Sequence, residues 1–316
     1  MTLSEQSLAF LFPGQGSQSV GMLKELADSF HEVGDTFGEA SDALGYDLFR
    51  LVMDGPEDRL NATEYTQPAM LAAGVAVWQV WQKVSEVRPV FMAGHSLGEY
   101  TALVCAQSLS LRDGIVLVRE RARLMQEAVP LGVGAMAAII GLKDDAVVQA
   151  CEMAGNDLEK ASPANFNAPG QVVIAGHAGA VSRAIENAKS EGARRCVVLP
   201  VSVPSHCPLM SEAALKFRES LSAVSFSSPS FRIIHNVDVA EHVDAPGIRT
   251  ALEKQLSGPV RWTETIRTLA DLGVTRCLES GPGSVLTGLN KRIAPEILTQ
   301  GLSDPSMFEK AKELWV

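Results

Sequence analysis

The sequence has few of the features that mark membrane, secreted or metal-binding proteins. Its apolar run at 8–12 is far shorter than the roughly 18–20 residues of a membrane span, and no basic segment precedes it as in a signal peptide. The five cysteines are odd in number and scattered, without a C-x-x-C pair. This pattern favours reduced thiols in a cytoplasmic protein and gives no zinc signature.

An excess of positive charge and nucleotide-binding motifs are also lacking. The chain has 27 Lys and Arg against 37 Asp and Glu, and the formal net charge of −10 disfavours nucleic acid as a partner. Neither a P-loop nor an H-E-x-x-H motif occurs. The segment Phe-Pro-Gly-Gln-Gly-Ser-Gln at 12–18 lacks the third glycine of a dinucleotide fingerprint, because position 19 is serine. Its tight Gly-Gln-Gly turn can instead direct the backbone N–H of Gln15 at an oxyanion.

What is present is the composition of a globular protein, with 46% hydrophobic and 20% charged residues. A length of 316 residues suits one large domain with an insertion, or two domains. Strand-like and helical segments alternate, which predicts an α/β fold with a mostly parallel sheet. We expect strands at 8–12, 90–93 and 274–278, and helices at 68–84, 99–106 and 284–293.

Residues 130–202 follow a different pattern. Strands are expected at 135–140, 161–165, 171–175 and 195–201, and helices at 144–154 and 178–191. This β-α-β-β-α-β order is typical of a ferredoxin-like module. We therefore expect a hydrolase-like catalytic domain formed by residues 1–129 and 203–316, with a ferredoxin-like subdomain, 130–202, inserted as the wall of a cleft.

The most informative stretch is Gly-His-Ser-Leu-Gly at 94–98. It stands between the strand expected at 90–93 and the helix expected at 99–106, and a G-x-S-x-G turn between strand and helix presents its serine as a nucleophile. The flanking glycines let neighbouring backbones approach, and the helix N-terminus favours developing negative charge. Ser96 is the candidate nucleophile. The alternative is a glycine-rich turn that happens to contain serine.

A serine nucleophile needs a base. His206 is favoured over His235 among the six histidines, because Pro204 and Pro208 fix the backbone around it. A structural histidine is the alternative, and His95 should point away from the serine it adjoins. A hydrolase would place an acid between serine and histidine. The aspartates in that interval look like helix-start or surface residues: Asp113, Asp144, Asp145 and Asp157.

Arg121 falls near the middle of the apolar arc of its helix, whereas Arg119 and Arg123 fall outside that arc. A guanidinium that faces the interior must find a carboxylate or several carbonyls, since an unpaired buried charge is expensive. An internal salt bridge and a ligand site are both open. A substrate carboxylate would be bound by the planar guanidinium through two parallel hydrogen bonds.

Together these motifs resemble the bacterial malonyl-CoA:acyl carrier protein transacylases of type II fatty acid synthesis. The resemblance spans nearly the whole chain. It rests on the motifs at 12–18 and 94–98, Arg121 before Met-Gln-Glu-Ala at 125–128, Asn-Phe-Asn-Ala-Pro-Gly-Gln at 165–171, Val-Pro-Ser-His at 203–206, Asn-Val-Asp at 236–238, Gln255 with Pro-Val at 259–260, and Gly-Pro-Gly at 281–283. Every chemistry-bearing position fits the family pattern.

The resemblance implies transfer of a malonyl group from malonyl-CoA to the phosphopantetheine thiol of acyl carrier protein. The mechanism would be ping-pong, through a malonyl-serine intermediate and without a bound cofactor. Ser96 would be the nucleophile, His206 its base and acid, and the backbone N–H groups of Gln15 and Leu97 the oxyanion hole. A serine thioesterase or esterase is the nearest alternative, and a non-catalytic carrier-binding protein is a second.

The resemblance also implies substrate-binding residues. Arg121 would pair with the malonyl carboxylate. In this family the histidine leans on a main-chain carbonyl near the position of Gln255, which would explain the missing acid, and Gln255 is expected at the substrate site. Asn165 would line the pocket or hydrogen-bond the backbone of the inserted subdomain. Leu97, and Val203 in Val-Pro-Ser-His where methylmalonyl-selective relatives have Tyr-Ala-Ser-His, favour malonyl.

Acyl carrier proteins are acidic, and so is this chain. A local basic patch must therefore overcome the overall repulsion. The candidate docking residues are Lys189, Arg194 and Arg195 in the inserted subdomain, and Lys291 and Arg292 after the Gly-Pro-Gly turn. The alternative for each cluster is a solvated charged face.

Overall fold

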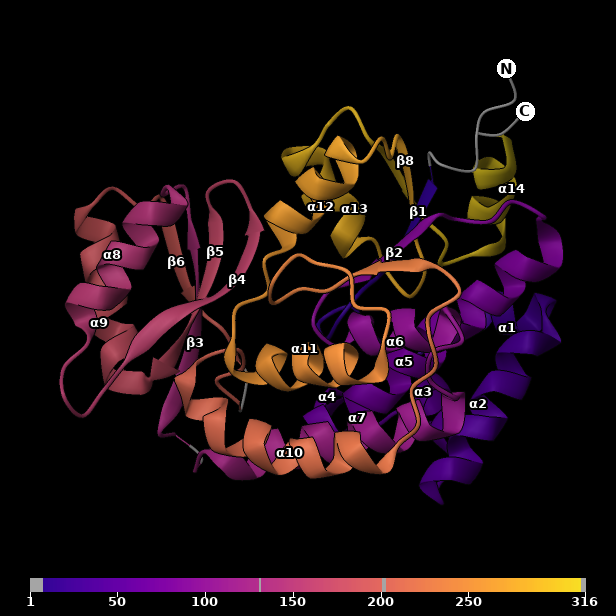
Figure 1. The fold of residues 1–316 in the computed structure, drawn as a ribbon, viewed down its shortest axis with the longest axis horizontal. Helices are drawn as coiled ribbons and strands as arrows, with labels where there is room; N and C mark the ends of the chain where they lie inside the picture. The colour runs from indigo at the N-terminus through magenta and orange to yellow at the C-terminus, as the bar shows by residue number, and fades with distance from the viewer. Residues whose placement is uncertain (1–7, 131, 201–202, 314–316) are drawn as a thin grey trace.

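The chain folds into two units, each built on its own β-sheet, in a computed structural model that describes residues 8–130, 132–200 and 203–313 (Figure 1). Helices cover the sheets in both units. Residue 131, the last residue of the strand expected at 195–201, and the expected boundary residue 202 lie outside the described residues.

The larger sheet has the strand order β7-β2-β1-β8-β9, and every neighbouring pair is parallel. Its strands are β1 (Leu8–Phe12), β2 (Phe91–Gly94), β7 (Arg232–Ile234), β8 (Arg276–Glu279) and β9 (Leu298–Gly301). The predicted α/β fold with a mostly parallel sheet is confirmed. The sequence did not predict β7 and β9, which form the two edges.

The central strand β1 shows why this sheet is covered on both faces. Its five residues are all buried, and they alternate between two hydrophobic clusters: Leu8, Phe10 and Phe12 in one, Ala9 and Leu11 in the other. Successive side chains of a strand point to opposite faces. A strand that is apolar at every position therefore needs helices on both sides.

The helices of the larger unit are α1 (Lys24–Ser29), α2 (His31–Leu44), α3 (Leu48–Asp54), α4 (Glu57–Asn61), α5 (Thr63–Val84), α6 (Gly98–Cys105), α7 (Leu111–Ala128), α10 (Ser211–Ala223), α11 (Ala245–Ser257), α12 (Trp262–Asp271), α13 (Val285–Ile293) and α14 (Pro305–Glu313), with a short 3-10 helix at Pro208–Met210. Helix α5 begins at Thr63 rather than at the expected Pro68. A proline this close to the start removes only one early backbone hydrogen bond, so the helix continues through it.

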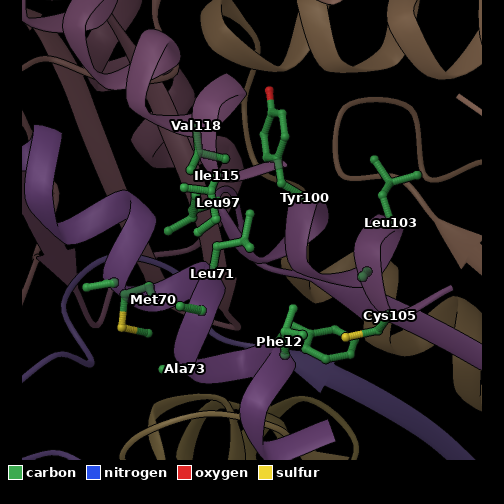
Figure 2. Packing of buried hydrophobic residues seen from close by; sticks show 14 of the residues in the cluster. Phe12, Met70, Leu71, Ala73, Leu97, Tyr100, Leu103, Cys105, Ile115 and Val118 are labelled. Carbon is green, nitrogen blue, oxygen red and sulfur yellow. The ribbon is translucent and has the colours of Figure 1, made fainter. Parts of the chain in front are cut away.

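Helix α5 is the centre of the larger core. Its buried residues pack with those of α6 and α7, and Figure 2 shows Leu71, Leu97 and Ile115 from three separate segments within one cluster. Phe10 packs on Trp78 and Trp81 with ring centroids 4.8 and 5.7 Å apart. This packing fixes the helices that carry the residues of the site. No helix among the described residues is long and apolar enough to cross a membrane.

The smaller sheet is antiparallel, with the order β4-β5-β3-β6. Its strands are β3 (Gly134–Ile140), β4 (Ala161–Ala168), β5 (Gln171–His177) and β6 (Arg195–Val198), and its helices are α8 (Asp144–Ala154) and α9 (Ala178–Ser190). In Figure 1 both helices lie on the side of this sheet that faces away from the larger unit. Ala137 and Ile139 of β3 pack in the cluster beneath the helices, while Met136 belongs to the opposite face.

Strand β4 ties the two units together. The Val260 N–H donates to the Ala164 carbonyl at 2.8 Å, and the Phe166 N–H donates to the Val260 carbonyl at 2.9 Å. The Thr263 hydroxyl donates to the Phe166 carbonyl at 3.0 Å. These bonds hold the open face of the smaller sheet against the larger unit.

Candidate active site

The site lies at the carboxyl ends of the parallel strands, where ligands bind in open α/β sheets. The neighbours β7, β2, β1 and β8 end at this edge and lead into Asn236, Ser96, Gln15 and Gly281, respectively. A cavity of about 240 Å³ separates these loops from the smaller sheet. Its wall combines Ser96, His206 and Arg121 with residues of β3, β4 and β5.

The turn after β2 holds Ser96 in the left-handed region, with a φ of 52°. The flanking glycines are sterically required: a Cβ on Gly98 would lie 2.0 Å from the Phe12 carbonyl oxygen, and one on Gly94 would lie 1.9 Å from the carbonyl carbon of Gly98. Asn236 braces the turn from β7, accepting from the Ser96 N–H at 2.7 Å and donating to the Gly94 carbonyl at 2.7 Å. The serine is thus presented at a strained, rigid bend.

His206 lies in hydrogen-bond contact with Ser96. The Ser96 hydroxyl donates to Nε2 of His206 at 2.7 Å. Nδ1–H of His206 donates to the main-chain carbonyl of Gln255 at 2.8 Å, which fixes the tautomer that leaves Nε2 free to accept. A carbonyl therefore stands where a hydrolase triad has its acid. Asp113 lies in the first turn of α7, Asp144 and Asp145 in that of α8, and Asp157 is exposed.

The electrostatics of the site keep His206 neutral. Burial and the nearby Arg121 guanidinium lower the pKa of His206 to about 3. A neutral imidazole is the form that can accept the serine proton. His235, the second candidate base, is fully buried elsewhere and its Nδ1 lies 2.5 Å from Oε1 of Glu99.

Arg121 is 1% exposed and faces the same cavity. Its Nη1 donates to Oε1 of Gln67 at 2.9 Å, and its Nη2 donates to Oε1 of Gln255 at 3.0 Å and to Oγ of Ser96 at 3.2 Å. All three partners are neutral. Within the described ranges no carboxylate accepts a hydrogen bond from this guanidinium, so the internal salt bridge left open by the sequence is not formed there.

Two backbone N–H groups are available for an oxyanion. Gln15 and Leu97 both line the cavity, and neither N–H donates to another group in the part of the chain that the structure describes. The N–H of Ser96 is already used by Asn236. The loop of Gln15 is held by its own contacts, since the Gly16 N–H donates to the side chain of Gln18 at 2.7 Å.

Gln255 is placed differently from the expected substrate contact. It is fully buried and is not part of the cavity wall. Its Nε2 donates to the Ser96 carbonyl at 3.0 Å and to Oε2 of Glu99 at 2.8 Å, while its Oε1 accepts from Arg121. Both ends of the amide are therefore engaged by protein groups.

Asn165 is buried and lines the cavity, and its backbone forms a bridge with Val260. The neighbouring Asn167 has a defined contact: Nε2 of His95 donates to its Oδ1 at 2.8 Å. His95 thus points away from the serine and links the two units. Its ring centroid lies 5.5 Å from that of Trp262.

No role for Gln67, Asn167 or Asn236 follows from the sequence alone. Asn167 and Asn236 stand in motifs that supported the family resemblance, so a signal existed for them. Gln67 precedes Pro68 in a helical segment and carries no comparable signal. Among the described residues no group of three His, Cys, Asp or Glu side chains is arranged to hold a metal ion.

The five candidate docking residues are exposed but lie in two places. Arg195 lies opposite Ile140 in the sheet, at the end of β3 that is away from Met136 and the cavity. Lys189 forms an ion pair with Glu186 at 2.8 Å. Lys291 and Arg292 lie on α13, whose first residues line the cavity. Arg292 donates to Gln171 and to the Pro169 carbonyl, so its guanidinium already contacts the smaller unit.

Comparison with known proteins gives a consistent family. The family model described as "Acyl transferase domain" matches residues 9–295. The malonyl CoA-acyl carrier protein transacylase of Salmonella typhimurium is 52% identical over 303 residues, which cover 96% of this chain and 98% of the relative. The chain belongs to the malonyl CoA-acyl carrier protein transacylase family.

Solved structures of the family agree with this assignment. The malonyl-CoA:acyl carrier protein transacylase of Xanthomonas oryzae pv. oryzae is 49% identical, covers 99% of this chain and 100% of its own, and superposes with a TM-score of 0.97. A malonyl-transacylase solved in complex with a type II PKS acyl-carrier protein is 51% identical, covers 98% of this chain and 99% of its own, and has a TM-score of 0.96.

The depressed pKa of His206 predicts how Ser96 reactivity depends on pH. Because the imidazole stays neutral down to about pH 3, the rate of Ser96 modification by an uncharged sulfonyl fluoride should change less than about twofold between pH 5 and 7. A histidine with the ordinary pKa of about 6.5 would give a more than tenfold fall over that range. In Arg121→Met the loss of the guanidinium raises the pKa of His206. The decrease in rate on acidification should therefore begin at a higher pH than in the wild type. A wild-type rate that follows an ordinary histidine titration contradicts the prediction, with Ser96→Ala giving the background.

Proposed function

We propose that this chain transfers the malonyl group of malonyl-CoA to the phosphopantetheine thiol of an acyl carrier protein through a malonyl-Ser96 intermediate. One observation carries the proposal: the buried Arg121 guanidinium lies 3.2 Å from Oγ of Ser96 and has only neutral hydrogen-bond partners among the described residues. A cation in that position suits an acyl group that ends in a carboxylate. The family assignment supports the same substrates.

In the first half-reaction Oγ of Ser96 attacks the thioester carbonyl carbon as its proton moves to Nε2 of His206. The oxyanion accepts hydrogen bonds from the N–H groups of Gln15 and Leu97, and each such donor is worth roughly 3 kcal/mol in comparable sites. Collapse breaks the carbon–sulfur bond. Coenzyme A leaves and takes the proton from His206, while Arg121 holds the malonyl carboxylate.

In the second half-reaction the thiol of the carrier protein gives its proton to His206 and attacks the malonyl ester. The same two N–H groups hold the second oxyanion. When the carbon–oxygen bond breaks, Ser96 recovers its proton from His206. Each step is acid–base or nucleophilic chemistry of these side chains, so the mechanism uses no cofactor.

Other residues support this chemistry without entering it. Gln255 is a positioning residue for Arg121 and His206, supported by its side-chain and main-chain bonds to the two. Asn165 contributes to the wall on the acyl side, supported by its place in the cavity lining. Leu97 and Val203 add apolar surface there, which suits malonyl.

We also propose that residues 1–129 and 203–316 form a hydrolase-like catalytic domain, with 130–202 inserted as a ferredoxin-like subdomain. The β-α-β-β-α-β order and the antiparallel strand order β4-β5-β3-β6 support the second assignment. The strand–turn–helix around Ser96 supports the first. A cytoplasmic location is proposed as well, supported by five free cysteines.

For the carrier protein we propose docking at the exposed Lys291 in the last turn of α13. The position of α13, whose Val285, Leu286 and Leu289 line the cavity, supports this site. Arg292 contributes partly, because it also holds the smaller unit. The cluster of Lys189, Arg194 and Arg195 is the secondary candidate, since it lies at the far end of the smaller sheet.

Intact-mass spectrometry tests the proposed function. After incubation with malonyl-CoA, the protein should carry one malonyl adduct that Ser96→Ala lacks, and holo-carrier should discharge the adduct while free water does so slowly. Rapid loss of the adduct to free malonate without a carrier would instead support a thioesterase. Absence of any adduct would rule out both enzymes and leave a carrier-binding protein.

Arg121→Ala should relax acyl selectivity. Removing the cation abolishes pairing with the malonyl carboxylate, so the preference for malonyl-CoA over acetyl-CoA should fall by about 100-fold, as expected for a lost buried charge pair. The measurement is the ratio of acylation rate constants for the two thioesters. Arg123→Ala is the matched control, because Arg123 lies on the same helix but is exposed and pairs with Glu120 and Glu127. An unchanged ratio in Arg121→Ala contradicts the assigned role.

Lys291→Glu should slow malonyl transfer to holo-carrier by about tenfold, because a charge reversal at a docking site repels an acidic partner. Acylation by malonyl-CoA should change less. Single-turnover rates of the two half-reactions provide the comparison, and Lys310→Glu on the exposed face of α14 is the control. Equal slowing of both half-reactions would argue against docking at Lys291.

A further inference from the structure

Behind the nucleophile lies a buried carboxylate that the mechanism above does not use. Glu99, in the first turn of α6, is fully buried. Its Oε2 accepts from Nε2 of Gln255 at 2.8 Å and from the Asn236 N–H at 3.1 Å, and its Oε1 lies 2.5 Å from Nδ1 of His235. A carboxylate removed from water is costly unless a cation compensates it.

The cation connected to Glu99 is Arg121. The side-chain amide of Gln255 bridges the two, with Oε1 accepting from Nη2 of Arg121 at 3.0 Å and Nε2 donating to Glu99. Burial lowers the pKa of Arg121; the neighbouring Tyr100 side chain opposes that decrease, and the charge of Glu99 opposes it to a smaller extent. The amide dipole is therefore oriented by opposite charges at its two ends.

His235 does not neutralise the negative charge of Glu99. Its Nε2 is buried and has no hydrogen-bond partner among the described residues. An imidazolium would leave a charged N–H unpaired at that atom, whereas a neutral ring that donates Nδ1–H to Glu99 leaves only a lone pair. The neutral form fits the geometry, so the carboxylate remains the counter-charge available to Arg121.

We propose that Glu99 is a positioning residue of the acyl site: it is the buried counter-charge of Arg121 and acts through Gln255, so that a substrate carboxylate competes with it for the guanidinium. This rests on the proposed function. The carboxylate of Glu99 stabilises the buried guanidinium of Arg121 when no substrate carboxylate is bound. It also lowers the affinity of the site for an acyl group that ends in a carboxylate. Removing the charge should therefore tighten carboxylate binding.

Glu99→Gln removes the charge with nearly the same shape. Its amide oxygen can accept from Gln255 and Asn236, and its NH₂ can donate to Nδ1 of His235 in the other tautomer. These hydrogen bonds are retained, at the cost of an unpaired neutral N–H at the buried Nε2 of His235. Malonate is the probe, titrated by calorimetry into each variant. The dissociation constant of malonate should fall by about tenfold in Glu99→Gln, as expected when a buried opposing charge is removed from a neighbouring cation. A merely structural role would weaken binding.

Two further variants sharpen the test. Glu99→Asp keeps the charge while shortening the side chain, and its malonate dissociation constant should stay within about threefold of wild type. Glu279→Gln is a matched control: Glu279 is also fully buried, but it accepts from the N–H groups of Leu286 and Thr287 at the start of α13. It should lose stability without tightening malonate binding.

The outcomes are distinguishable. Unchanged or weaker malonate binding in Glu99→Gln overturns the role of Glu99. A change beyond threefold in Glu99→Asp also overturns it, and this second test can be read even if Glu99→Gln is too unstable to measure. Equal tightening in Glu279→Gln also overturns it. If Arg121→Ala binds malonate as well as wild type does, the carboxylate site itself is wrong, and the proposed function fails together with this inference.

Discussion

The arrangement on which the site depends is a guanidinium buried beside a nucleophile without a carboxylate bonded to it. An uncompensated buried charge costs several kcal/mol, so the fold must supply dipoles and a more distant opposite charge. Gln67 from α5 and Gln255 from α11 supply the amide oxygens. The apolar arc of α7, packed on α5, carries Arg121 into the interior.

The two units have different tasks around that cation. The parallel sheet delivers four loops to one edge, since all its strands run in the same direction and end together. The antiparallel sheet contributes one face as a wall and is held in place through β4, Val260 and the His95–Asn167 bond. Within the larger unit, Asn236 braces the Ser96 turn and also donates its backbone N–H to Glu99.

Sequence patterns predicted the features that depend on neighbours in the chain. The all-apolar run of β1, the glycines around Ser96 and the helical position of Arg121 are local signals, and the structure has each of them. The edge strands β7 and β9 have three and four residues with mixed polarity, too short for a pattern. The partners of Ser96 and Arg121 could not be derived in this way, because Asn236 and Gln67 lie 140 and 54 residues away along the chain.

The carbonyl partner of His206 bears on why such a site transfers rather than hydrolyses. A triad carboxylate stabilises imidazolium, and thereby lets histidine deprotonate water during hydrolysis. Here a neutral carbonyl and a nearby guanidinium act on the ring instead, and burial with that cation lowers the pKa of His206 to about 3. A thiol, with a pKa of about 8.5, gives up its proton to a weak base far more readily than water, with a pKa of about 15.7. In the second half-reaction a weak base therefore favours a bound thiol over water as the acceptor. The Ser96 hydroxyl is as weak an acid as water, and its proton reaches His206 because the hydroxyl is already held 2.7 Å from Nε2.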